Sequence, residues 1–141
     1  MGEVRKPSDP DLGPRERVEL DVLRKFGLRW AVLVVWAEEL RGWKLTVPPE
    51  VTRKLDEARI QISSGCFSSC TVGCRLSEAE AALVSVAASA GSGPAASSVD
   101  VWLERLAQAM VDEEAAQRLL TIPAVRIHYS RCGFGPCDCP G

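Results

Sequence analysis

A seam of apolar residues dominates the first third of the chain. Its members recur at alternating spacings of three and four residues, as on one face of a helix: Leu23, Phe26, Trp30, Leu33, Ala37 and Leu40. Residues 31–36 are apolar without interruption, so this helix is expected to run through the middle of the core. Pro14 suits its first turn, and Gly42 is expected to end it.

A second helix is predicted to open at the Pro48-Pro49 pair. Its buried face is expected to consist of four residues at helical spacing: Val51, Leu55, Ala58 and Ile62. A third helix is predicted from Ser77 to about Ala90, because Ser77 and Glu80 have the spacing of a capping box.

Two more helices are expected after a Gly- and Ser-rich loop. Ser97 or Ser98 would cap the first of them, whose inward-facing residues are expected to be Trp102, Leu106, Ala109 and Met110. Asp112 is placed to cap a further short helix that ends near Leu120. Pro123 prevents that helix from continuing.

Residues 124–130 alternate between apolar and polar. Val125, Ile127 and Tyr129 fall on one side, and polar residues stand between them. This alternation predicts a strand. Such a strand would pair with an extended piece near Leu45–Val47 or with a second subunit, or it would remain an extended tail.

Together these patterns predict a mainly α fold. We expect residues 14–141 to form a single-domain compact bundle of four to five helices with a short C-terminal strand or extended cysteine-rich tail. Residues 1–13, with Pro7, Pro10 and Gly13, are expected to be a flexible N-terminal tail. The chain has 141 residues, 46% of them apolar, and is therefore long enough to bury a core.

Charge and hydropathy limit the partners of the protein. A net charge of −2 and a pI of about 5.5 provide no basic field for nucleic acid. The polar N-terminus shows no secretory signal. The most apolar run, Leu28–Ala37, contains Arg29 and is too short to span a bilayer. We therefore expect a cytoplasmic protein that binds neither nucleic acid nor a membrane.

The residues that carry chemistry are six cysteines in two clusters. The first cluster has the spacing C-x3-C-x3-C and the second C-x4-C-x-C, and their members are Cys66, Cys70 and Cys74, then Cys132, Cys137 and Cys139. The 57 residues between the clusters contain no cysteine. Glycine and serine around the first cluster favour a helix end followed by a loop. We expect the two clusters to meet at one end of the second and third helices.

Thiolates that converge from two segments are the ligands of structural zinc sites and iron–sulfur clusters. In a reducing cytosol, clustered cysteines favour metal or redox roles over structural disulfides. The spacings match neither the C-x2-C pairs of zinc ribbons nor the ferredoxin pattern, so they do not specify the metal. The sequence thus predicts a small intracellular protein that binds zinc or an iron–sulfur cluster through these six cysteines, in a structural or electron-transfer role.

The alternative is that the same six cysteines form disulfides between the clusters and no cofactor is bound. Each such bridge would close a loop of roughly 60 residues and contribute about 3–4 kcal/mol. The chain contains no Asn and only three Gln, a depletion that is found in hyperthermophiles, whose intracellular proteins do carry disulfides. The protein would then be a non-enzymatic structural or interaction domain.

No reaction can be derived from the sequence, because the common nucleotide, protease and hydrolase motifs are absent. His128, the only histidine, is a weaker candidate metal ligand than the cysteines and is expected to be a polar surface residue. The acidic runs Glu38-Glu39 and Asp112-Glu113-Glu114 are expected to be solvated helix faces. Trp43, if exposed, would mark an interface with a protein partner or a second copy in a homodimer.

Overall fold

A computed structural model describes residues 14–64 and 69–132 of the protein. All regular secondary structure in these two ranges is helical. In chain order the helices are α1 (Pro14–Gly42), α2 (Pro49–Ser64), α3 (Ser69–Ala88), α4 (Pro94–Val111), α5 (Glu113–Leu120) and α6 (Pro123–Ser130). The predicted mainly α bundle is confirmed, and the ranges for α1 and α2 agree with those expected from the apolar pattern.

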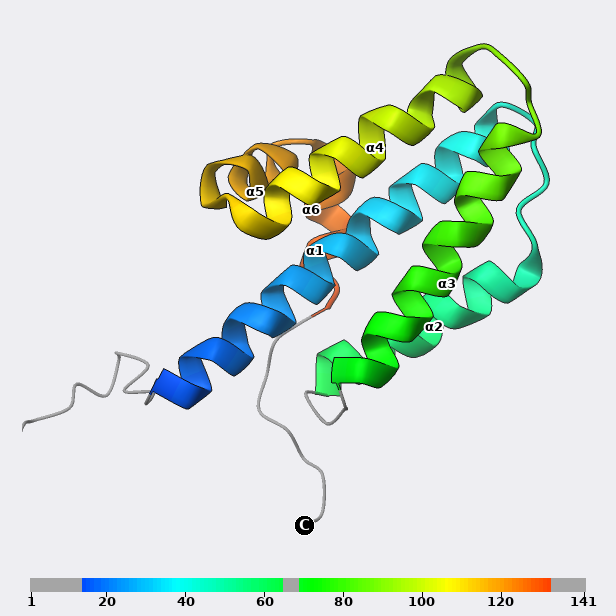
Figure 1. Ribbon diagram of the computed structural model, residues 1–141. Coiled ribbons are helices and arrows are strands. Elements are labelled where there is room, and N and C mark those ends of the chain that lie inside the picture. The colour runs from blue at the N-terminus through cyan, green and yellow to red at the C-terminus, as the bar shows by residue number, and fades with distance from the viewer. Residues whose placement is uncertain (1–13, 65–68, 133–141) are drawn as a thin grey trace, which may run out of the picture.

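The long helix α1 is the central element of the bundle. It packs against α2, α3, α4 and α6, while α5 packs against α4 and α6. In Figure 1, α3 and α4 lie on the two sides of α1, α2 lies behind α3, and α5 and α6 form a compact unit near the C-terminal end of α4. Within the part of the chain that the structure covers, no helix combines the length and the apolar character needed to cross a membrane.

The middle of α1 is buried almost all round, as the uninterrupted apolar run predicts. Five of its residues are 0% exposed: Ala31, Val32, Leu33, Trp36 and Leu40. The predicted face of α2 is also confirmed, with every member at most 5% exposed: Val51, Leu55, Ala58 and Ile62. Burial of each large apolar side chain contributes about 1.5–3 kcal/mol, so this contact surface holds the bundle together.

Two buried tryptophans fix the neighbouring helices on α1 by hydrogen bonds. Trp30 Nε1 donates to the Leu55 carbonyl oxygen of α2 at 2.8 Å. Trp36 Nε1 donates to the Ser98 hydroxyl of α4 at 2.8 Å. A buried indole N–H without an acceptor would cost about 1–3 kcal/mol, so these bonds select one position for each helix.

The prediction of a strand over residues 124–130 is wrong, because this segment forms α6. Pro123 occupies the first turn, where a helix does not need its missing N–H. Val125 and Tyr129, four residues apart, share the helix face that packs on the core, and Val125 is 0% exposed. Ile127, which a strand would place beside them, is 60% exposed. In a segment this short, the apolar residues fit the spacing of a strand as well as that of a helix. Packing against α1 favours the helix.

The third helix begins at Ser69, eight residues before the predicted start. The predicted capping box at Ser77 is therefore wrong, because Ser77 lies inside the helix. The predicted loop before Ser77 is also wrong, because residues 69–76 are helical. The reason is a buried seam at helical spacing whose members are all 0% exposed: Val72, Leu76, Ala79 and Leu83. Its packing outweighs the weak helix propensity of serine and glycine. Ser77 and Glu80 instead accept hydrogen bonds from Arg29 of α1 at 3.1 and 3.2 Å.

The starts of α4 and α5 are set by two different signals. α4 begins at Pro94, earlier than the predicted serine caps, after Gly93 with a φ of 91° that favours glycine. Ser98 lies inside the helix and is buried. For α5 the prediction is confirmed, because Asp112 Oδ1 accepts the backbone N–H of Glu114 at 3.1 Å.

Candidate functional site

The cysteines of the two predicted clusters differ in how far the structure describes them. Cys66, Cys137 and Cys139 lie outside the described residues, as does the predicted tail 1–13. Cys70 lies in the first turn of α3, and Cys74 lies one turn further along that helix. Cys132 follows α6 directly.

Cys74 is an exposed free thiol in a charged depression between α2 and α3. Three cations and two carboxylates line this depression with it: Arg53, Lys54, Arg75, Glu57 and Glu78. Lys54 Nζ contacts Glu78 Oε1 at 2.8 Å, and Arg75 Nε contacts Glu57 Oε1 at 3.1 Å. The hydrogen bond from Lys54 lowers the pKa of Glu78. Cations therefore outnumber carboxylates by three to two around the thiol.

Cys132 lies in the opposite environment. It is a free thiol that is 0% exposed within the core. Burial raises its pKa to about 11, and the nearby charge of Arg59 opposes this shift. Its backbone N–H donates to the Tyr129 carbonyl at 3.1 Å, and burial also raises the pKa of the Tyr129 hydroxyl. Cys132 is therefore a core residue whose burial favours the thiol over the thiolate.

The structure does not join the two described thiols, Cys74 and Cys132, which carry no disulfide and have different surroundings. Among the described side chains, no group of three or more His, Cys, Asp or Glu residues is arranged to hold a metal ion. The side chains of the other four cysteines lie beyond what the structure describes. The meeting of the two clusters therefore stays a prediction.

His128, on α6, is held by contacts through both ring nitrogens. Nδ1 lies 3.3 Å from Arg131 Nη1, and Nε2 lies 3.5 Å from Glu38 Oε1. When Nδ1 accepts from this arginine, the ring proton lies on Nε2, on the side of Glu38. The ring also packs edge-on against Trp30, with centroids 6.0 Å apart. The side chain is 12% exposed, so His128 is less open to solvent than expected for a polar surface residue.

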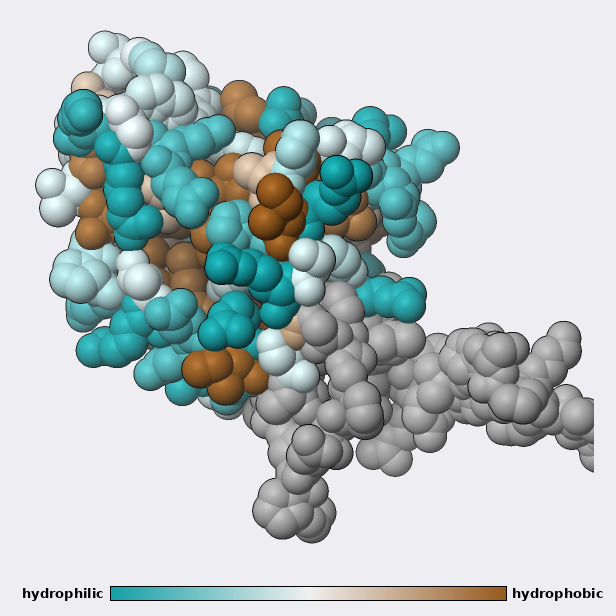
Figure 2. All heavy atoms as spheres, turned by 180° about the vertical axis from the view of Figure 1, so that it is seen from behind, coloured by the Kyte–Doolittle hydropathy of each residue, from teal (hydrophilic) through white to brown (hydrophobic). Residues whose placement is uncertain are grey.

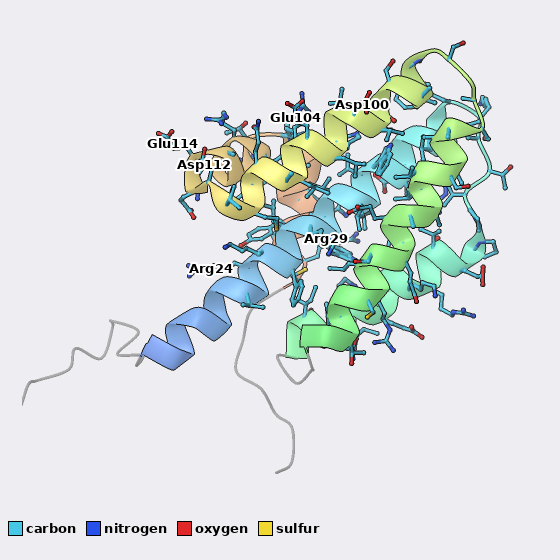
Figure 3. All side chains as sticks on the ribbon, in the orientation of Figure 1. Arg24, Arg29, Asp100, Glu104, Asp112 and Glu114 are labelled. Atoms are coloured by element: carbon cyan, nitrogen blue, oxygen red, sulfur yellow. The ribbon has the colours of Figure 1, made fainter. Side chains whose placement is uncertain are left out.

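The acidic runs combine solvated and structural positions. Figure 3 shows Asp100, Glu104, Asp112 and Glu114 along the outer side of α4 and α5, while Arg29 extends from α1 towards α3. Glu39, by contrast, accepts the indole N–H of Trp102 at 2.9 Å. It is therefore a structural contact between α1 and α4 that the sequence pattern did not reveal.

Trp43 is 39% exposed just beyond α1, as an interface residue would be. Its exposure by itself does not identify a partner, since single exposed apolar side chains are common on protein surfaces. Comparison of this chain with protein-family models, with curated proteins and with solved structures gives no match.

Proposed function

We propose that this protein binds zinc or an iron–sulfur cluster through cysteines of the segments 66–74 and 132–139, in a structural or electron-transfer role. The observation that carries the proposal is the state of Cys74, which is a free, exposed thiol one helical turn after Cys70. Its exposure leaves the sulfur atom accessible to a metal ion, and the thiolate is the form that coordinates zinc or iron.

Within the second cluster, we assign Cys132 a role in the core and metal binding to Cys137 or Cys139. Cys132 is fully buried directly after α6, so we assign it the role of an apolar anchor. The remaining five thiols, Cys66, Cys70, Cys74, Cys137 and Cys139, exceed the four that a tetrahedral zinc ion or a cubane cluster takes from the protein. The expected ligands are therefore the first cluster together with Cys137 or Cys139.

The test is anaerobic purification of the full chain, followed by metal analysis and by intact mass with and without thiol alkylation. Stoichiometric zinc or iron together with alkylatable thiols after denaturation would support the proposal. A metal-free protein whose mass is lower by about 2 Da for each pair of cysteines, and which resists alkylation, would overturn it in favour of disulfides.

Two variants sharpen this test. Cys74→Ser should reduce the bound metal with little effect on stability, because the side chain is exposed. Cys132→Ser should retain the metal in the folded fraction while lowering the free energy of unfolding, because a buried thiol is replaced by a hydroxyl. Equal retention of metal by both variants would argue against the first cluster as the ligand set.

A further inference from the structure

A groove with charged walls lies on the side of α2 away from Cys74. It lies between α1, α2 and α6 and has a volume of about 450 Å³. Helix α1 contributes Glu38 and Arg41, and α2 contributes Asp56 and Arg59. Helix α6 contributes His128, and Arg131 follows as the residue directly after that helix. The molecule is seen from the side of α2 and α6 in Figure 2, where hydrophilic side chains cover much of the surface.

The floor of the groove is apolar and fixed. Trp30, Val34 and Leu55 line it, and the hydrogen bond from Trp30 to the Leu55 carbonyl joins two of these residues. The volume is in the range of small-molecule sites, which are typically about 300–1,000 Å³. A rigid apolar floor with charged walls is the general construction of such sites.

The two carboxylates of the groove, Glu38 and Asp56, offset part of its positive charge, but neither forms an ion pair with a groove arginine in the described structure. Arg41 Nη2 donates to the Thr52 hydroxyl at 2.8 Å, and Arg131 Nη1 contacts His128 Nδ1 at 3.3 Å. Among residues 14–64 and 69–132, no salt bridge joins Arg41, Arg59 or Arg131 to a carboxylate. Three guanidinium groups therefore keep their charge and several N–H donors for another acceptor.

This arrangement fits one class of ligand better than others. A single carboxylate is satisfied by one arginine, whereas a phosphate monoester carries nearly two charges and three terminal oxygens. Arginine binds phosphate through paired N–H donors, and the Thr52 hydroxyl adds a donor beside Arg41. Asp56, an exposed carboxylate at the groove, is able to accept hydrogen bonds from hydroxyl groups of the ligand's organic part.

We propose that the groove between α1, α2 and α6 binds the phosphate group of a small phosphorylated molecule. Arg41, Arg59 and Arg131 bind the phosphate oxygens, and the apolar floor contacts the remainder of the ligand. Glu38 fixes the His128 ring through Nε2, and the ring in turn positions Arg131 through Nδ1. The groove residues lie on the opposite side of α2 from Cys74. The groove is nevertheless close to Cys132, because Arg131 precedes that residue directly and the charge of Arg59 acts on its thiol.

The test uses inorganic phosphate as the probe and His128 as the reporter. Because the chain has a single histidine, its imidazole ¹⁵N and ¹H signals form one assignable set. Titration of the full-length protein with phosphate at constant pH and ionic strength should shift these signals along a saturable curve. Chloride at equal ionic strength should not shift them.

Variants on the two sides of α2 provide the control. Arg59→Gln should weaken phosphate binding by about tenfold or more, the effect of losing a charge-assisted hydrogen bond. Arg53→Gln, on the same helix but in the Cys74 depression, should leave the affinity unchanged. Circular dichroism and the unfolding midpoint of each variant establish that both are folded.

Three results would overturn the proposal. The first is the absence of a saturable shift with phosphate in the folded protein. The second is an equal loss of affinity in Arg59→Gln and Arg53→Gln, which would show non-specific attraction. The third is tighter binding of succinate than of phosphate, which would assign the groove to dicarboxylates instead.

Discussion

The two polar surfaces on either side of α2 use the same residue types but match their charges differently. On the α3 side, each carboxylate has a cation: Lys54 contacts Glu78 at 2.8 Å, and Arg75 contacts Glu57 at 3.1 Å. Such exposed pairs contribute little stability, but they leave few unsatisfied charges. The exposed thiol of Cys74 lies beside these ion pairs.

On the α6 side, the cations contact neutral acceptors instead. Arg41 bonds a threonine hydroxyl and Arg131 an imidazole nitrogen, so their charges are positioned without being cancelled. One side of α2 therefore carries cations that form ion pairs with carboxylates, and the other side carries cations that form none among the described residues. The composition alone, with nearly equal numbers of acidic and basic residues, gives no indication of this difference.

The largest effect is expected from weakening the packing of α6, which lines the groove but not the depression around Cys74. Val125→Ala should lower the free energy of unfolding by about 2–3 kcal/mol, because Val125 is 0% exposed against the core. Ile127→Ala on the same helix should change it by less than about 0.5 kcal/mol, because Ile127 is 60% exposed. Urea denaturation measures both, and hydrogen exchange should show faster opening of α6 than of α3. Equal losses for the two variants would contradict the assigned face of α6.

The buried thiol of Cys132 predicts a pH dependence on the groove side. Its pKa is about 11 in the folded protein and about 8.5 when unfolded, so the unfolded state releases the proton first. Its stabilising contribution is complete below about pH 8.5 and decreases as the pH rises towards 11, by at most about 1.4 kcal/mol per unit. Denaturant unfolding between pH 8 and pH 10 should show this slope in the wild type and in Cys74→Ser. A slope that persists in Cys132→Ala would assign it to another group.

A smaller effect is expected one turn beyond Arg59 on α2. The Ser63 hydroxyl is buried and has no hydrogen-bond partner in the described structure. Ser63→Ala should therefore raise the free energy of unfolding by about 1 kcal/mol, because it removes an unsatisfied polar group and improves helix propensity. Ser77→Ala, whose hydroxyl accepts from Arg29, should bring no such gain. A loss of stability in Ser63→Ala would reveal an acceptor or donor for this hydroxyl.

The smallest effect is expected on the α3 side. Glu78→Gln removes the carboxylate that Lys54 contacts, but the Glu78 side chain is 59% exposed and solvent screens the pair. The urea midpoint should not change measurably at neutral pH, nor should the affinity for phosphate. A clear shift in either quantity would mean that the two sides of α2 are energetically coupled.

The length of each apolar pattern decided how well the fold could be predicted. α1 and α2 present several consecutive turns of buried residues, so their ranges and faces follow from periodicity alone. α6 has only eight residues, over which Val125 and Tyr129 satisfy a strand and a helix equally. Its true period becomes evident only from contact with α1, which is more than eighty residues away along the chain.

The two candidate sites show the same contrast. The cysteines stand out because their spacings are local, and those spacings are read directly from the sequence. The groove combines Glu38, Arg59 and His128 with other residues from three distant helices, and no spacing connects them. Only the local pair of His128 and Arg131, three residues apart at the end of α6, could have indicated the groove, and the predicted strand placed these two residues differently.

The central position of α1 also has a consequence for synthesis of the chain. This helix leaves the ribosome before every helix that covers it, and ten of the thirteen residues in its stretch Leu28–Leu40 are apolar. The surface that receives Val125 remains open to water until α6 has emerged. A nascent chain halted before Pro123 would therefore expose a long apolar strip along α1, which is the kind of surface that chaperones bind and that promotes aggregation.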